Sequence, residues 1–591
     1  MDQDIVAAQL QAALAARRRG DAVAAAVALR SVLAVEPAHP GAAHLLGVMA
    51  LERGDAAAAL SLFDSVLHGA SGFAPLHYNR GNALAAMQRL DDAAAAYRQC
   101  IALDPGLADA HYNLGNVLAG AGQLVPAIAA VAEASRLRPD LAGAWSRLGT
   151  LQSEAGRWDE AVASFDRALA ADGGDADAWN RRGVALHQRR LFTEALASYD
   201  RAIVLSPKLA DAWNNRGNAL HDLRRVDSAI AAYSQALALD PQSPPATVNL
   251  GMLEQETGRF NAARASYRRA LALRPRYAEA ARRLAGLDLL QGRFTEGWAG
   301  FERAHDWSEA KDAAGGVPFW RGEPLAGRRI LLSEPNGIGD TLQFFRFVPR
   351  LLDAGAQIAF YGPRAIRALL RGFADRIEFV DDPDGEYDFQ ALLWSLPHYL
   401  GINEAQLGMD APYLSLDPSR IPRWSHLAEP GAINVGICWQ GNPTRKIDAL
   451  RSIPLASFAP LARVPGLRLV SLQQGHGLEQ LAVLPDGMQV RVPGEGFDAG
   501  PDAFADTAAL MQSLDLVLSA DTAITHVAAG FGRPAWLALA RVPDWRWMLD
   551  RDDSPWYPSV RLFRQQQLDD WSPVFEQIAG LLARPDALSR P

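Results

Sequence analysis

Cysteine is scarce in this chain of 591 residues, and its scarcity narrows the class of protein. Only Cys100 and Cys438 occur, far apart in the sequence. Two distant thiols build neither a disulfide framework nor a thiolate zinc site, and such usage is typical of a reducing compartment. We therefore expect a cytoplasmic protein.

The sequence lacks the charge and hydropathy patterns that predict a signal peptide or a membrane-spanning segment. The N-terminus carries Asp2 and Asp4 where a signal peptide requires positive charge. No uncharged apolar run reaches the roughly 18 residues that a membrane-spanning helix needs. Neither a signal peptide nor a membrane span is expected.

Concentrated positive charge is absent as well. The chain has 58 basic and 67 acidic residues, for a net charge of -9, and its longest basic block is Arg17 to Arg19. A protein that binds nucleic acid usually shows a basic patch or stripe. Nucleic acid is therefore not an expected partner.

What the sequence does contain is a repeat of 34 residues between positions 8 and 307. Two residue types follow separate grids with this one period, and an aromatic or other apolar residue stands in the second half of each unit. The grids consist of Gly47, Gly81, Gly115, Gly149, Gly183, Gly217 and Gly251, and of Pro105, Pro139, Pro207, Pro241 and Pro275. The pattern resembles the tetratricopeptide repeat (TPR), which implies an α-helical superhelix (α-solenoid) of about eight repeats, each with two antiparallel helices, plus a partial unit.

Asparagine recurs two positions before the repeat glycine, at Asn79, Asn113, Asn215 and Asn249, while Arg147 and Arg181 fill this position in the units between. These positions are expected to line the inner helices, where amides could bind the backbone of an extended peptide. This resembles the asparagine ladder of eukaryotic protein O-GlcNAc transferase. Asparagine is also common there in ordinary TPR sequences, so both interpretations stay open.

After a linker at residues 308–327, strands alternate with helices, which predicts an α/β region of two Rossmann-like lobes. The first lobe is expected at 328–425 and the second at 430–591. The predicted strands begin at Arg329, Gln357, Ile377, Phe389, Ile433, Leu467, Leu516, Trp536 and Val560. A binding cleft is expected between the lobes, beyond the carboxyl ends of the strands.

One segment of the second lobe predicts an anion site. An apolar strand ends at Ser519, Asp521 stands where a helix N-cap is expected, and Ala523 to Gly530 reads as a helix. The amide groups and positive dipole end of such a helix suit a diphosphate, and the side chains of Thr522 and His526 could reach the same place.

Two segments resemble the bacterial ADP-heptose lipopolysaccharide heptosyltransferases. The first strand of the α/β region is followed by Gly337, Gly339 and Asp340, where that family carries a Gly-Asp turn. The family's Asp-Thr-x-x-x-His segment is matched by Asp521, Thr522 and His526. The resemblance implies a GT-B glycosyltransferase in which Asp340 is the general base and the second segment contacts the donor phosphates; a plain N-cap is the alternative for Asp340.

A third segment contributes further candidates for donor binding. Trp439, Gly441 and Asn442 follow the first strand of the second lobe, and Arg451 stands where the family has a lysine. Guanidinium suits phosphate, and Arg445 and Lys446 are rivals for this role.

Two other segments favour structural roles. The aromatic stretch from Pro543 to Pro558 is better explained by packing between lobes than by stacking on a base or sugar. The Asp-Pro-Asp sequence from Asp382 to Asp384 is interpreted as a turn, because GT-B enzymes generally work without a metal. We expect no metal and no cofactor beyond the nucleotide-sugar substrate.

The combined architecture is similar to protein O-glycosyltransferases, including bacterial enzymes that modify flagellin. It implies sugar transfer, with inversion and without metal, to Ser or Thr of a protein held by the repeats, with flagellin as one candidate. A lipopolysaccharide or capsule glycosyltransferase is the alternative. Arg364, Arg367 and Arg371 could offer it a basic rim, although a solvated helix face explains these arginines equally well. A TPR scaffold with an inactive transferase region is the third hypothesis.

Overall fold

A computed structural model describes residues 2–306, 315–334, 337–408, 412–443 and 448–584. The chain divides into two compact units, residues 1–242 and residues 243–591. The first unit is helical, whereas the second contains four more helices of the repeat region and the whole α/β region.

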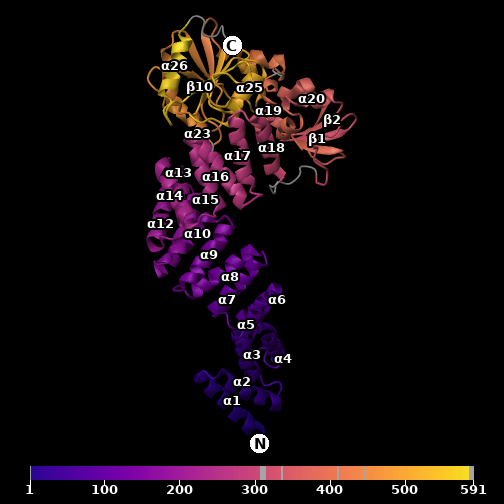
Figure 1. Ribbon diagram of the computed structural model, residues 1–591, viewed down its shortest axis with the longest axis vertical. Helices are drawn as coiled ribbons and strands as arrows, with labels where there is room; N and C mark the ends of the chain where they lie inside the picture. Colours follow the sequence, from indigo (N-terminus) through magenta and orange to yellow (C-terminus); the bar gives the residue numbers. More distant parts are fainter. Residues whose placement is uncertain (1, 307–314, 335–336, 409–411, 444–447, 585–591) are drawn as a thin grey trace. The chain divides into compact units, whose positions relative to one another are not determined.

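The repeat region consists of consecutive helix pairs, drawn in indigo to magenta in Figure 1. Each pair buries its small and apolar residues between its own two helices and, within each unit, against the neighbouring pairs. In the first unit the helices are α1 (Asp2–Arg18), α2 (Ala22–Val35), α3 (Pro40–Glu52), α4 (Ala56–Val66), α5 (Ala74–Ala86), α6 (Leu90–Leu103), α7 (Ala108–Gly120), α8 (Leu124–Leu137), α9 (Ala142–Glu154), α10 (Trp158–Ala171), α11 (Ala176–Gln188), α12 (Phe192–Leu205), α13 (Ala210–Asp222) and α14 (Val226–Leu239). In the second unit they are α15 (Pro244–Glu256), α16 (Phe260–Leu273), α17 (Ala278–Leu290) and α18 (Phe294–Asp306).

The recurrence of glycine every 34 residues is explained by close contact between the two helices of a pair. A Cβ atom placed on Gly217 would lie 2.5 Å from Cε1 of Tyr233, and one on Gly183 would lie 2.5 Å from Cε1 of Tyr199. The tyrosine rings are buried. Glycine is therefore required wherever the first helix passes directly under the large residue of the second.

The first α/β lobe is built on a parallel sheet with the strand order β3-β2-β1-β4. Residue Ile330 of β1 lies level with Ile358 of β2 and with Phe389 of β4. The elements are β1 (Arg329–Ser333), α19 (Ile338–Phe345), α20 (Val348–Asp353), β2 (Gln357–Tyr361), the 3-10 helix η1 (Arg364–Phe373), β3 (Ile377–Val380), β4 (Phe389–Leu392), η2 (Leu393–Ser395) and α21 (Leu396–Tyr399).

Short helical segments connect this lobe to the next. They are η3 (Glu404–Gln406), η4 (Pro418–Arg420), α22 (Ile421–Trp424) and η5 (Ser425–Leu427).

The second lobe is built on a parallel sheet with the order β10-β9-β8-β5-β6-β7. Numbered from its first strand β5, this is the order 3-2-1-4-5-6 of a doubly wound Rossmann-type sheet read from the other edge. Its elements are β5 (Ile433–Cys438), α23 (Asp448–Arg451), η6 (Leu455–Arg463), β6 (Leu467–Ser471), η7 (Leu478–Ala482), β7 (Val490–Arg491), α24 (Ala505–Met511), β8 (Leu516–Ser519), α25 (Ala523–Gly530), β9 (Ala535–Leu539), η8 (Trp545–Trp547), β10 (Val560–Arg564) and α26 (Ser572–Leu582).

The prediction of helical repeats followed by an α/β region with two parallel sheets is confirmed. The sequence pattern also predicts one continuous helix from Asp340 to Leu352. This prediction is wrong, because the chain forms α19 and α20 instead. Pro349 in the first turn of α20 lacks the N–H that a continuous helix would use there. The strand β7 was not predicted, since only two residues pair with β6.

The helices α17 and α18 share a core with the α/β region. The ring of Trp298 in α18 contacts Phe344 of α19 and Trp545 of η8, at centroid distances of 6.3 and 5.5 Å. Trp545 also lies against the ring of Trp556. Because these aromatic rings pack together, the last helices of the repeat region belong to the same compact unit as the lobes.

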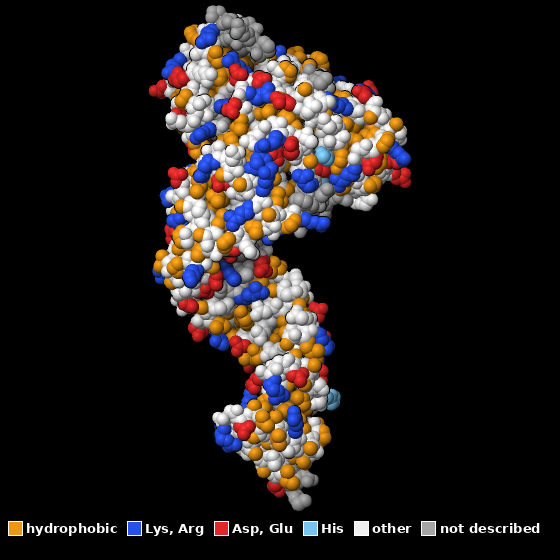
Figure 2. Space-filling model, viewed as in Figure 1, with side chains coloured by type: hydrophobic (Ala, Val, Ile, Leu, Met, Phe, Trp, Pro, Cys, Tyr) orange, Lys and Arg blue, Asp and Glu red, His pale blue; other side chains and the backbone are white. Residues whose placement is uncertain are grey.

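The surface carries mixed charge. Lys and Arg side chains lie interspersed with Asp and Glu side chains over the face shown in Figure 2. Among the residues described, none of the helices combines the length and the apolar character needed to pass through a lipid bilayer.

The repeat glycines give a stability prediction that uses two positions in one helix, α9. A Cβ on Gly149 would lie 2.9 Å from Cε1 of buried Phe165, whereas a Cβ on Gly143 would meet nothing within 4 Å. We expect Gly149→Ala to cost about 1–3 kcal/mol of unfolding free energy through overpacking. Gly143→Ala should be neutral or stabilise by up to about 1 kcal/mol. Urea unfolding followed by circular dichroism measures both, and equal effects of the two variants would contradict this packing.

Candidate functional site

The carboxyl ends of β5 and β8 lie side by side at the centre of the second sheet. Cys438 at the end of β5 is level with Ser519 at the end of β8, and the Ala520 amide donates to the Cys438 carbonyl at 2.8 Å. From β5 the chain continues to β6 on one side, and from β8 it continues to β9 on the other. In open α/β sheets, ligands bind in the crevice that forms at such a switch point.

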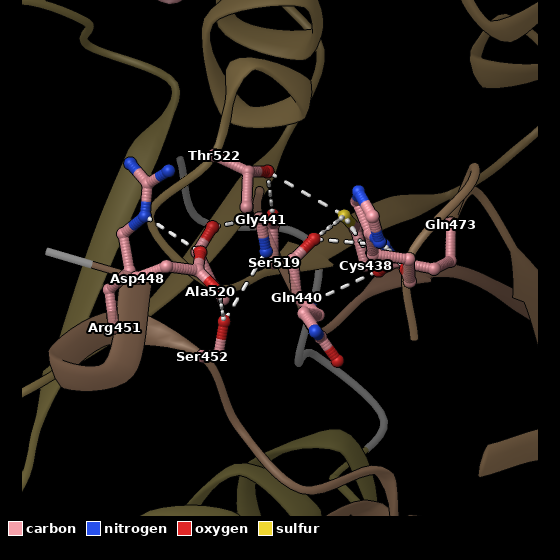
Figure 3. A network of polar contacts seen from close by, with 11 residues as sticks. Cys438, Gln440, Gly441, Asp448, Arg451, Ser452, Gln473, Ser519, Ala520 and Thr522 are labelled. Carbon is pink, nitrogen blue, oxygen red and sulfur yellow. Dashed lines mark hydrogen bonds and ion pairs between the residues drawn. The ribbon is translucent and has the colours of Figure 1, made fainter. Parts of the chain in front are cut away.

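The loop after β5 is held by a side chain that the sequence did not indicate. The side-chain oxygen of Gln473 accepts hydrogen bonds from the backbone N–H groups of Trp439 and Gln440, each at 3.0 Å. Its side-chain nitrogen donates to the carbonyl of Gln440 at 2.8 Å and of His476 at 2.7 Å. Figure 3 shows Gln473 beside this loop. Because a glutamine at a strand end has no distinctive spacing, only the fold reveals its role.

Gly441, one of the residues predicted to bind a donor, packs tightly against the side chains of Ser452, Asp448 and Arg451. Its amide donates to Ser452 Oγ at 3.3 Å, and a Cβ there would lie 2.4 Å from Asp448 Oδ1 and 2.7 Å from Arg451 Nη2. Asp448 also accepts from Ser452 Oγ at 2.9 Å and from Arg451 Nε at 3.3 Å. The Arg451 head, which is 26% exposed, is thereby fixed at the rim of the loop.

The other candidates of this segment differ in exposure. Trp439 is fully buried, and its indole N–H donates to the Gly477 carbonyl at 3.1 Å, so its ring supports the loop from within the core. Asn442 is exposed in the turn that follows Gly441. Arg445 and Lys446 lie outside the described residues.

The turn after β8 positions Thr522 at the start of α25. Its Oγ1 lies 3.0 Å from Ser519 Oγ, which itself donates to the Ala520 carbonyl at 2.6 Å, so Thr522 is the donor to Ser519. Cys438 Sγ lies 3.6 Å from the same Thr522 oxygen (Figure 3). The N-cap of α25 is Thr522 and not Asp521 as predicted, because Asp521 still belongs to the turn.

No side chain caps α25 within the part of the chain that the structure describes. The first amide N–H groups of the helix, which follows directly after β8, are therefore left without a capping side-chain oxygen. This arrangement, with the positive end of the helix dipole, is suited to an anionic ligand.

The Asp521 carboxyl is an unusually weak acid. Burial raises its pKa to about 6, and the nearby Asp544 carboxylate adds to the rise, while Arg451 and Arg546 oppose it. A carboxyl that is partly protonated near neutral pH repels a phosphate less than an ordinary carboxylate does.

His526, four residues further along, is buried and neutral. Its Nδ1 lies 2.9 Å from the Tyr557 hydroxyl, and its ring stacks on Trp547 with centroids 5.7 Å apart. Burial lowers the pKa of His526 well below its ordinary value, and the charges of Arg546, Arg346 and Arg451 lower it further.

The two lobes meet directly at α19 and α25. A Cβ on Gly339 of α19 would lie 3.2 Å from Cδ2 of His526 and 3.8 Å from Cα of Ala523. Gly337 is the N-cap of α19, so Asp340 is the third residue of the helix and not its cap. The plain N-cap interpretation of Asp340 is therefore wrong.

The Asp340 carboxylate is bound by Arg546, a residue of the second lobe. Arg546 donates through Nη2 to Asp340, through Nη1 to Asp544 at 2.8 Å, and through Nε to the side chain of Gln343. Its guanidinium also stacks on the Trp545 ring at 4.3 Å. Burial works to lower the pKa of Arg546, but the Asp544 and Asp340 carboxylates raise it above its ordinary value.

Arg546 thus stands at the centre of the predicted site, although no sequence motif indicated a role for it. Its charge acts on Asp340, Asp521 and His526 together. The only signal was its place in the aromatic stretch between Pro543 and Pro558. The packing interpretation of that stretch is confirmed, since Trp547, Trp556 and Tyr557 are fully buried.

The turn interpretation of the Asp-Pro-Asp sequence is also confirmed. The carboxylate of Asp382 accepts the amide N–H of Asp384 at 2.9 Å.

The asparagines of the repeats lie apart from this set of residues in the sequence and form their own contacts. Asn79 Nδ2 lies 2.9 Å from His44 Nε2, Asn113 donates to the Tyr78 hydroxyl at 3.1 Å, and Asn215 donates to Asn180 at 3.0 Å. Each partner stands one repeat earlier. Asn249 occupies the same position in α15 of the second unit and is half-buried.

Comparison with known proteins defines the class of the N-terminal half. The tetratricopeptide repeat family matches residues 10–75, 146–210 and 248–310, and further TPR families match residues 210–243 and 81–122. The N-terminal half of the chain therefore contains tetratricopeptide repeats, and a parallel α/β region follows them.

A distant homologue is Protein FlbA of Caulobacter vibrioides, which is 27% identical over 290 residues. The match covers 44% of this chain and 48% of FlbA, so the chain spans about half the length of the curated relative.

Solved structures with similarity to the repeats include YrrB and MamA. YrrB, a TPR protein described as having an unusual peptide-binding site, is 23% identical with a TM-score of 0.29, over 31% of this chain and 95% of YrrB. MamA from Desulfovibrio magneticus RS-1 is 20% identical with a TM-score of 0.27, over 29% of this chain and 96% of MamA.

The neutral state of His526 gives a prediction on pH. The unfolded chain binds a proton at this residue below about pH 6.5, whereas the folded chain does not, so stability present above that pH is lost as the pH falls. We expect His526→Gln to remove a slope of about 1.4 kcal/mol per pH unit between about pH 6 and pH 5. Urea unfolding across this range measures it, with His426→Gln at an exposed position of the same unit as control. An unchanged slope in His526→Gln would contradict the assignment.

Proposed function

We propose that the protein is a glycosyltransferase of the two-lobed GT-B type that transfers a sugar from a nucleotide-sugar to Ser or Thr of a protein. The observation that carries the proposal is the meeting of Asp340, from the first lobe, with Arg546 beside the start of α25 in the second. A catalytic base and an anion-binding helix start are the two groups that sugar transfer requires.

The roles follow from the chemistry of each group. Asp340 takes the proton of the acceptor hydroxyl as it attacks the anomeric carbon. The amides at the start of α25, with Arg546 and Arg451, stabilise the negative charge of the departing diphosphate or phosphate. Gly337, Gly339 and Gly441 let the backbone come close to the donor, and Thr522, His526 and Asn442 complete the proposed donor site. A single carboxylate suffices for an inverting transfer without a metal.

A protein acceptor is favoured over a lipid-linked one. The repeats offer amides for a polypeptide at Asn79, Asn113, Asn215 and Asn249, and flagellin stays one candidate for it. The basic rim that would favour a lipopolysaccharide or capsule acceptor is reduced to one net positive charge, because Arg364 and Arg367 share Asp381 at 2.6 and 2.8 Å and Arg371 pairs with Asp417 at 3.2 Å.

The proposed donor site predicts stabilisation by one nucleotide. Thermal unfolding of the full chain with UDP, ADP, GDP or CMP should show one nucleotide that raises Tm, since a ligand at about 100 times its Kd adds roughly 2.7 kcal/mol. Arg451→Gln should weaken that nucleotide about tenfold by removing a charged hydrogen bond. Arg463→Gln, at an exposed ion pair of the same lobe, should not. A Tm that no nucleotide moves would favour the inactive scaffold.

If Asp340 is the catalytic base, its substitution should impair sugar transfer and leave nucleotide binding intact. With a labelled nucleotide-sugar and the protein fraction of the host cell, Asp340→Asn should lower label incorporation by about 10²- to 10⁴-fold while nucleotide binding persists. Asp353→Asn, at an exposed aspartate of the same lobe, should transfer normally. The label should enter polypeptide and be released by mild alkaline elimination, as expected for a sugar on Ser or Thr. Label confined to lipid extracts would contradict a protein acceptor.

A further inference from the structure

A polar row of side chains follows the first helices α5, α7, α9, α11 and α13 of the first unit. We define this ladder face by Tyr78, Asn79 and Asn82 of α5 and their equivalents at 34-residue intervals. The equivalents are Tyr112, Asn113, Asn116, Ser146, Arg147, Thr150, Asn180, Arg181, Val184, Asn214, Asn215 and Asn218. All of them are half-buried except Arg181, which is exposed. Amides and hydroxyls dominate the set, and its only charged members are Arg147 and Arg181.

The two arginines take the place of asparagine in a series of bonds between repeats. Asn113 donates to Asn82 of the preceding repeat at 3.1 Å. In the same sense, Arg147 Nε donates to Asn116 Oδ1 at 2.8 Å, and Arg181 Nη1 donates to Thr150 Oγ1 at 2.8 Å. The guanidinium groups are thus anchored to the ladder face by neutral partners.

Most of the hydrogen-bonding capacity of these arginines is unused. A guanidinium has five N–H donors, and each of the two donates one to a side chain of the preceding repeat. Within residues 2–242, no carboxylate lies within ion-pair distance of either one, and Asp177, one turn before Arg181, is exposed and makes no pair with it. The adjacent Arg182 is different, since it binds Asp166 at 2.6 Å and Ser198 at 2.7 Å.

The distance between neighbouring repeats determines how far apart two carboxylates of one peptide must lie to reach both Arg147 and Arg181. Packed helices lie about 8–10 Å apart, and an extended chain of the polyproline II type advances about 3.1 Å per residue with about three residues per turn, so that side chains three residues apart lie on the same face. Neighbouring repeats are therefore matched by side chains about three residues apart. A carboxylate accepts two N–H groups of a guanidinium in parallel.

We propose that the ladder face binds an extended polypeptide segment with two acidic side chains three residues apart. Arg147 and Arg181 each pair with one carboxylate, and the amides of the flanking repeats bind the peptide backbone. The inference shares with the proposed function only the binding of a polypeptide by the repeats. Because it requires neither nucleotide nor sugar transfer, binding without nucleotide tests it separately.

The probes are two fluorescein-labelled peptides that differ only in charge. One has the sequence Gly-Ser-Thr-Asp-Ser-Thr-Asp-Ser-Gly, and the other has asparagine in place of both aspartates. Fluorescence anisotropy with the full-length protein should show roughly tenfold tighter binding of the aspartate peptide, as expected for two exposed ion pairs. The preference should shrink as salt rises, because salt screens exposed charges.

Matched variants of the protein assign the preference to the two arginines. The double variant Arg147→Gln, Arg181→Gln keeps a donor for Asn116 and Thr150 and should bind both peptides equally, whereas Lys at both positions should retain most of the preference. The control is Arg167→Gln, Arg201→Gln, at exposed arginines 34 residues apart on the second helices of the same two repeats. Equal binding of the two peptides by wild type, binding of neither at about 1 mM, or an equal loss in the control would overturn the proposal.

Discussion

The contact between the two lobes of the α/β region depends on the hydrogen bonds of the buried Arg546 guanidinium. Arg546 binds Asp340 and Gln343 of the first lobe while it belongs to a loop of the second, where Asp544 also holds it. A buried charge is tolerated only when its partners are in place, and loss of one partner leaves an uncompensated charge. The two lobes are therefore joined by a charged contact as well as by packed aromatic rings.

This contact also determines what can happen beside it. Gly339 touches His526, so the helices that follow β1 and β8 begin side by side. Because the imidazole is neutral, the positive charge there comes from Arg546, Arg451 and Arg346. In the proposed reaction, a donor diphosphate competes with Asp340 for the Arg546 guanidinium, so donor binding and release of the base would be linked.

Much of the fold was predictable because it rests on local patterns. Apolar runs mark β1, β2 and β3 at the predicted residues, and the glycine grid follows from helices that cross under a large side chain such as Tyr233. Local propensity was less informative where helices are short. The segment at η6 contains Pro460 and forms a 3-10 helix, and the N-cap of α25 shifted by one residue to Thr522.

The site was predictable only in part, because its main contacts join residues distant in sequence. The sequence pointed to Asp340 and Asp521 separately, yet the residue that links the lobes, Arg546, is 206 positions from Asp340. Gln473 was missed for the same reason, since its partners lie in the loop after β5. The grouping of α17 and α18 with the lobes likewise depends on Trp298 and Trp545, whose contact no periodicity indicates.

The most direct measurement is a crystal structure with the nucleoside diphosphate that the protein binds. The account predicts a diphosphate on the amides at the start of α25, with Arg546 turned toward it and Asp340 facing the open position for an acceptor. A nucleotide bound elsewhere on the protein, or an Arg546–Asp340 pair that stays closed over an empty switch point, would contradict it.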